Sequence, residues 1–142
     1  MVERICAYGI AAARANHDVV MTPGSHTYFD QFQSRNTAAE PLAIGGFLPI
    51  DTVYSYDPVP AELEPQFAKH ILGAQAQIWT EYIEGPKNVE YMAFPREAAL
   101  AEALWTSRDR KDFASFTGRL AQHVARLEAL DVNLRPLELP RP

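Results

Sequence analysis

Residues 70–82 read HILGAQAQIWTEY, and this stretch decides the fold class. Ile71, Leu72 and Ile78 are apolar, while Gly73 and the alanines at 74 and 76 are small enough for neighbouring backbones to approach closely. Gly85-Pro86 closes the stretch on its far side. A short apolar run bounded in this way predicts an interior strand of a parallel sheet.

Trp79 and Glu81 stand at the end of this run, two residues apart. In an extended backbone their side chains leave on the same side. A flat apolar ring beside a charged acceptor suits a sugar, whose C–H face stacks on the indole while its hydroxyls donate to the carboxylate. The simpler interpretation is a core tryptophan followed by an exposed glutamate.

A second strand with a similar end lies earlier in the chain. Residues 17–22 form a short β-branched and apolar run closed by Pro23, which predicts a buried strand. Tyr28 and Asp30 follow it, again an aromatic ring and a carboxylate two residues apart. Loops on a rigid scaffold are where sites usually lie, so the two pairs together predict one binding site.

Four helices are expected, at residues 10–15, 61–69, 89–105 and 109–130. The third has Asn88 as an N-cap and a bend or break at Pro95. The fourth carries an apolar stripe for core packing: Phe113, Phe116, Leu120, Val124 and Leu127. Residues 31–57 are expected to form a long connection with little helical character that packs partly onto the body or over a site.

Strands that alternate with helices predict βαβ units, a parallel sheet and an α/β fold class. Binding residues at the carboxyl ends of parallel strands are typical of α/β barrels and of doubly wound sheets. A (β/α)₈ barrel needs eight strands and about 250 residues, whereas this chain has two predicted strands in 142 residues. Residues 1–142 are therefore expected to be one unit, the final part of a larger domain.

Composition excludes several function classes. The formal net charge of −5 comes without a basic stripe, so nucleic acid is not an expected partner. No apolar run reaches membrane-spanning length, and the N-terminus lacks the layout of a signal peptide. Cys6 is the only cysteine and the histidines show no metal-ligand spacing, so no internal disulfide, metal or other cofactor is predicted.

Two catalytic interpretations compete with sugar binding. Ser25, His26 and Asp30 are the residue types of a hydrolase triad, but no G-x-S-x-G elbow surrounds the serine, and adjacent residues of an extended segment point to opposite sides. Asp30 and Glu81 could also form an acid–base pair. Each stands beside an aromatic residue, which favours gripping hydroxyls over giving up a proton.

Four blocks of the sequence carry a family resemblance: DVVMTPGSHTYFDQFQ (18–33), EPLAIGGFLPIDTVYSYDPVP (40–60), HILGAQAQIWTEYI (70–83) and VEYMAFPREAALAEALW (89–105). In this order they resemble the last quarter of the catalytic domain of glycoside hydrolase family 20, the β-N-acetylhexosaminidases. The resemblance extends from about Gly9 to Arg135. It implies a partial (β/α)₈ TIM barrel in which residues 17–22 are the seventh strand and residues 71–79 the eighth.

The resemblance also implies residue roles. Tyr28 matches a tyrosine that hydrogen-bonds the acetamide carbonyl of an N-acetylhexosamine and stabilises an oxazolinium-like intermediate. Trp79 matches a tryptophan that lines the acetamide pocket and packs on the sugar. Asp30 and Glu81 match acids that bind the distal hydroxyls. The implied reaction removes terminal, non-reducing N-acetylhexosamine residues with retention, the substrate's own acetamide oxygen attacking the anomeric carbon.

Other parts of the family pattern have no match here. The catalytic Asp-Glu pair, the sugar-gripping arginine and further pocket tryptophans belong upstream, and Met1 to Tyr8 does not resemble the expected end of a sixth strand. The chain alone is therefore expected to be inactive and to self-associate through exposed barrel edges. A secreted or periplasmic location is implied only by the resemblance. The alternative is a non-catalytic module that binds a carbohydrate or a partner.

Overall fold

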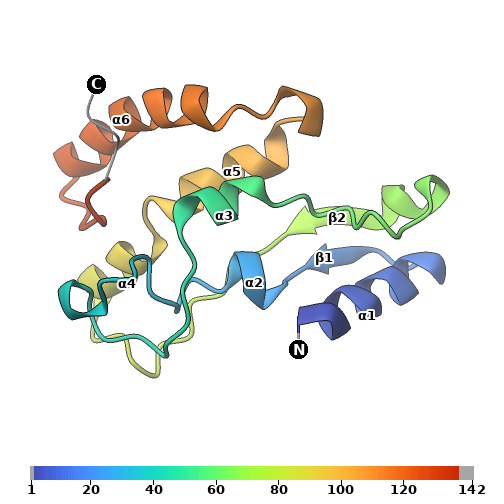
Figure 1. Cartoon of the computed structure of the whole chain (residues 1–142), viewed down its shortest axis with the longest axis horizontal. Helices are drawn as coiled ribbons and strands as arrows, with labels where there is room; N and C mark the ends of the chain where they lie inside the picture. The colour runs from blue at the N-terminus through green and yellow to red at the C-terminus, as the bar shows by residue number, and fades with distance from the viewer. Residues whose placement is uncertain (1, 138–142) are drawn as a thin grey trace.

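A computed structural model describes the backbone of residues 2–137 and the side chains of residues 6–137. The helices are α1 (Val2–Arg14), α2 (Gly24–Thr27), α3 (Ile50–Ser55), α4 (Pro86–Ala93), α5 (Arg96–Trp105) and α6 (Phe113–Ala129). The strands are β1 (Val19–Met21) and β2 (Ile71–Ala74), and short 3₁₀ turns lie at Thr37–Ala39, Pro65–His70 and Arg108–Arg110. Figure 1 shows α1 on one side of the strand pair and α3, α5 and α6 on the other.

The two strands pair in parallel, as the alternating pattern predicts. Val19 lies opposite Ile71 but Val20 lies opposite Gly73, so β2 holds one extra residue at this point. Gly73 has φ +139°, a backbone conformation that residues with a Cβ rarely adopt. The glycine in this stretch therefore accommodates an irregularity in the strand pairing.

Both strands are shorter and less buried than expected. They span three and four residues, and Val20 is 48% and Leu72 64% exposed. Each strand has a strand neighbour on one side only within residues 2–137, and the Val20 and Leu72 side chains are only partly covered, in an open hollow that Leu104 and Trp105 also line. The expected interior strand is thus half-covered here, and apolar surface is exposed as the sequence predicts.

The main core lies between the sheet and helices α3, α5 and α6. Its buried members include Met21 at the end of β1, Phe29 and Leu48 from the region that follows β1, and Phe116 and Leu120 from α6. The apolar stripe of α6 is thus core packing, as predicted. Phe113 at its start is 37% exposed, and Asp112 caps the helix by accepting a hydrogen bond from Ser115 N. Three residues of the stripe, Phe116, Leu120 and Leu127, are buried and anchor this helix to the body.

Several helix boundaries differ from those expected. The first helix begins at Val2 and includes Gly9, where a Cβ would come within 2.7 Å of the Met21 sulfur. Residues 61–69 do not form an α-helix, because a 3₁₀ turn occupies Pro65–His70. The third helix does divide at Pro95, but its first half begins at Pro86 after Gly85 rather than after Asn88. The connection 31–57 is not free of helix, since α3 lies within it and buries Val53 and Tyr54.

Candidate functional site

The two predicted residue pairs are brought together by strand-like pairing that continues beyond β1 and β2. Phe29 N donates to Gln77 O at 2.7 Å, and Gln77 N donates to Thr27 O at 2.8 Å. These bonds form a parallel bridge between Tyr28 and Gln77. Two residues further along each segment stand Asp30 and Trp79, so the pairing places them level with each other.

One hollow of about 420 Å³ is lined by Tyr28, Asp30, Trp79 and Glu81, with Gln31 and Ile44. All four predicted residues therefore share a pocket at the carboxyl ends of the two strands. Trp79 is 54% exposed, which excludes the interpretation as a core tryptophan. Its indole is free on the solvent side, as stacking on a ligand requires, while Glu81 is exposed beside it.

Asp30 differs from Glu81 in being buried, with 4% of its surface exposed. Its Oδ1 has no hydrogen-bond partner among the described residues. Burial raises the pKa of the Asp30 carboxyl, the Glu81 charge raises it further, and a backbone hydrogen bond and the Arg96 charge oppose this rise. A buried acceptor without its full complement of donors is costly unless a partner is supplied, and sugar hydroxyls are donors of the right kind.

Gln31 and Ile44 are pocket residues that the sequence patterns did not single out. Gln31 Nε2 donates to Gly24 O at 2.8 Å, which ties the pocket floor to the start of α2. Gly46 has φ +73°, and a Cβ there would come within 2.6 Å of Gln31 Oε1. The Gly-Gly pair thus lets residues 44–46 close against Gln31, consistent with the expectation that this connection packs over a site.

The Ser25–His26 pair needs one correction. The segment is the helical turn α2 rather than extended backbone, so the two side chains do not point apart: Ser25 Oγ lies 2.8 Å from His26 Nδ1. The His26 ring stacks on Tyr56 at 5.0 Å, and burial lowers its pKa. Asp30 makes no hydrogen bond to His26 in the described part of the chain, so the structure assembles no triad.

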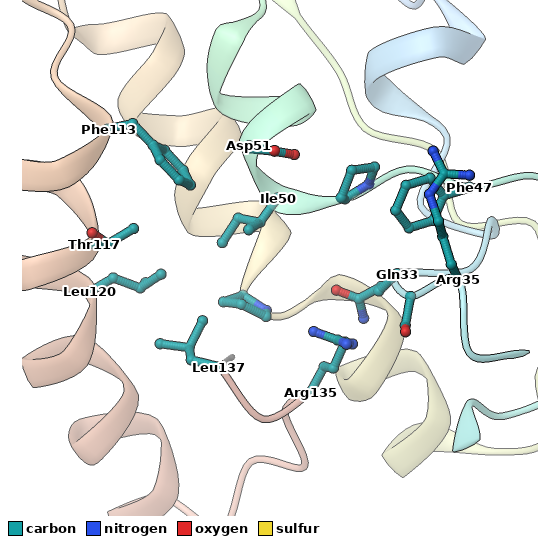
Figure 2. A pocket seen from close by; sticks show the side chains of 13 residues that line it. Gln33, Arg35, Phe47, Ile50, Asp51, Phe113, Thr117, Leu120, Arg135 and Leu137 are labelled. Atoms are coloured by element: carbon teal, nitrogen blue, oxygen red, sulfur yellow. The ribbon is translucent and has the colours of Figure 1, made fainter. Parts of the chain in front are cut away.

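A second pocket, of about 400 Å³, lies between α3, α6, the residues near Gln33 and the segment that ends at Leu137 (Figure 2). Arg35, which stacks over the Phe47 ring at 4.4 Å, and Arg135 border it. It contains none of the four predicted residues. Within the described side chains no cluster of three or more His, Cys, Asp or Glu is placed to hold a metal ion, and no described helix is long and apolar enough to cross a membrane.

Comparison with known proteins matches residues 4–108 to the family described as glycosyl hydrolase family 20, catalytic domain. The chain is 47% identical over 126 residues to a beta-hexosaminidase of Porphyromonas gingivalis, covering 88% of this chain and 16% of that protein. It is 35% identical over 116 residues to a beta-N-acetylhexosaminidase of Cellulomonas fimi, covering 81% of this chain and 23% of that protein.

Solved structures of the same family share the fold. An exo beta-N-acetylglucosaminidase of Vibrio harveyi, crystallised with N-acetylglucosamine, superposes with TM-score 0.76 at 35% identity over 92% of this chain and 20% of that one. A beta-N-acetylhexosaminidase of Streptomyces coelicolor gives TM-score 0.77 at 29% identity over 94% of this chain and 27% of that one. The chain thus spans less than a third of these relatives. It belongs to glycosyl hydrolase family 20 and corresponds to an α/β part of that family's catalytic domain.

Proposed function

We propose that this chain supplies sugar-binding residues of a β-N-acetylhexosaminidase that removes terminal, non-reducing N-acetylhexosamine residues by the substrate-assisted, retaining route. The observation that carries the proposal is the shared pocket: two aromatic–carboxylate pairs, about 50 residues apart, line one hollow at the ends of two parallel strands. That chemistry complements a sugar ring, which has apolar faces and a rim of hydroxyls.

Each residue has a role in this proposal. The indole of Trp79 packs on the sugar and lines the acetamide pocket, and the Tyr28 hydroxyl donates to the acetamide carbonyl. That contact holds the acetamide oxygen toward the anomeric carbon and stabilises the charge that develops as the oxazolinium-like intermediate forms. Asp30 and Glu81 accept hydrogen bonds from the distal hydroxyls.

The same proposal assigns β1 and β2 to the seventh and eighth strands of a (β/α)₈ barrel. The general acid and the acetamide-orienting carboxylate then lie on other strands, outside these 142 residues. A barrel of this kind places residues from several strands around one site. The chain alone is expected to bind the sugar without hydrolysing its glycosides.

Two measurements test this function. Titration of N-acetylglucosamine into the 142-residue chain should quench or shift tryptophan fluorescence saturably, whereas glucose, which lacks the acetamide, should bind more weakly. Grafting residues of this chain into the matching segment of the P. gingivalis beta-hexosaminidase should preserve hydrolysis of an aryl N-acetylglucosaminide. Sugar binding with an inactive graft would instead support a non-catalytic binding module. Absence of both would reject the assignment.

A further inference from the structure

Arg96, the first residue of α5, is fully buried. Its guanidinium donates to four main-chain carbonyls: Phe29 O at 2.5 Å, Met92 O at 2.6 Å, and Gln31 O and Leu48 O at 3.1 Å each. No carboxylate of the described residues forms an ion pair with it within 4.0 Å. Arginine is almost never fully buried without a charged partner. Here the buried guanidinium of Arg96 donates its hydrogen bonds to backbone carbonyls instead.

Two of these carbonyls belong to the residues on either side of Asp30. Arg96 Nη2 donates to the carbonyl of Phe29, and Arg96 Nη1 donates to the carbonyl of Gln31. The guanidinium carbon also lies 4.8 Å from the centroid of the Phe29 ring. The planar guanidinium presents its donors in a rigid fork. One rigid group therefore holds the peptide group that precedes Asp30 and the peptide group that follows Gln31.

We propose that Arg96 is a positioning residue for Asp30: by holding the main-chain carbonyls of Phe29 and Gln31, it fixes the backbone on either side of Asp30 and so the direction in which the Asp30 carboxylate meets the sugar hydroxyls. The inference rests on the proposed function, which makes Asp30 a hydroxyl acceptor. It adds a residue outside the pocket lining, from a helix that contributes nothing else to the site.

The charge of Arg96 also favours the proposed role, because it stabilises the ionised form of the Asp30 carboxyl. Burial and the Glu81 charge favour the protonated Asp30 carboxyl, and the Arg96 charge opposes them. Burial lowers the pKa of Arg96 to about 9, with Glu40, Asp30 and Tyr91 raising it and Arg135 lowering it. The guanidinium therefore stays charged at neutral pH and supports the ionised acceptor.

Arg96 also joins α5 to Leu48 and Met92, so a loss of stability alone would not identify a positioning role. Three variants of the 142-residue chain separate the two roles. Arg96→Gln removes the charge and the fork, and Arg96→Lys keeps the charge without the fork. Gln33→Leu is the matched control, because Gln33 is 6% exposed and donates to Tyr91 O at 2.6 Å without touching the carbonyls beside Asp30.

The readouts are the Asp30 carboxyl-carbon titration by NMR and the Kd for N-acetylglucosamine. Arg96→Gln should raise the pKa of Asp30 and weaken sugar binding roughly tenfold or more, the usual effect of misplacing a hydrogen bond to a charged group. Arg96→Lys should leave the pKa of Asp30 near its original value but still weaken binding. Gln33→Leu should lower the melting temperature and leave both readouts unchanged.

A folded Arg96→Gln chain with an unchanged Asp30 titration and unchanged backbone shifts at residues 29–31 would overturn the inference. The inference would also be overturned if Gln33→Leu changed the Asp30 titration and the Kd for N-acetylglucosamine as much as Arg96→Gln does. Should Arg96→Gln not fold, the unsubstituted chain still decides, because the Arg96 Nε resonance must show a titration step that Asp30→Asn removes. These NMR readouts need no sugar. Failure of the original chain to bind N-acetylglucosamine would therefore reject the proposed function separately.

Discussion

Replacing Trp79 by alanine isolates the stacking contribution to sugar binding. Trp79 is 54% exposed, and a tryptophan offers up to about 250 Å², so roughly 135 Å² of its surface faces solvent. If a sugar covers about half of this, near 70 Å², burial at about 25 cal/mol per Å² contributes about 1.7 kcal/mol. The Kd for N-acetylglucosamine should then rise about 15- to 20-fold.

The assay is an NMR titration that follows the backbone amides of residues 28–30, since removing the indole also removes a fluorescence reporter. Trp105 supplies a matched control: it is 89% exposed and lines a different surface, beside Val20 and Leu72. Both alanine variants should unfold within about 0.5 kcal/mol of the original chain, as exposed substitutions do. An unchanged Kd for Trp79→Ala, or an equal loss for Trp105→Ala, would refute the stacking argument.

Tyr28→Phe should weaken binding of N-acetylglucosamine but not of glucose in parallel titrations, because only the acetamide contact is lost. Burial and the Glu81 charge raise the pKa of the Asp30 carboxyl above its ordinary 3.8. The folded chain therefore binds the carboxyl proton more tightly than the unfolded chain does, and the free energy of unfolding falls as the pH rises above 3.8. Asp30→Asn should therefore raise stability at neutral pH in urea unfolding while abolishing sugar binding; a destabilised variant would contradict this sign. Leu120→Ala, at a site 2% exposed, should cost about 2–5 kcal/mol by the same unfolding assay, and a cost under 1 kcal/mol would contradict its core position. Leu72→Lys should reduce self-association in sedimentation velocity, and an unchanged sedimentation profile would exclude the exposed sheet as the contact.

Several features followed from local sequence signals. The two parallel strands, the break at Pro95 and the core stripe of α6 are each encoded by residues close together in the chain. The shared pocket also followed from a local rule, since parallel strands bring their carboxyl ends to one edge. Where the sequence resembled a family, the comparisons confirmed that family over residues 4–108.

Local signals were insufficient where long-range contacts decide the outcome. α3 forms inside a segment without clear periodicity because Val53 and Tyr54 are buried against α5 and α6. The Ser25 and His26 side chains meet because a helical turn begins at Pro23 and Gly24, where the sequence predicted an extended segment. In the sequence Arg96 looks like an ordinary helical arginine. Only the folded structure shows that it donates a hydrogen bond to the Phe29 carbonyl, 67 residues away in the chain.

The sequence by itself determined which chemistry is present: two rings and two carboxylates at the ends of two β-prone runs. Tertiary structure alone decided that Asp30 is buried and Glu81 exposed. It also decided that a guanidinium from α5 holds the backbone around Asp30. The physical reason is that side-chain chemistry is a property of each residue, whereas burial and hydrogen-bond partners depend on segments that meet only after the chain has folded.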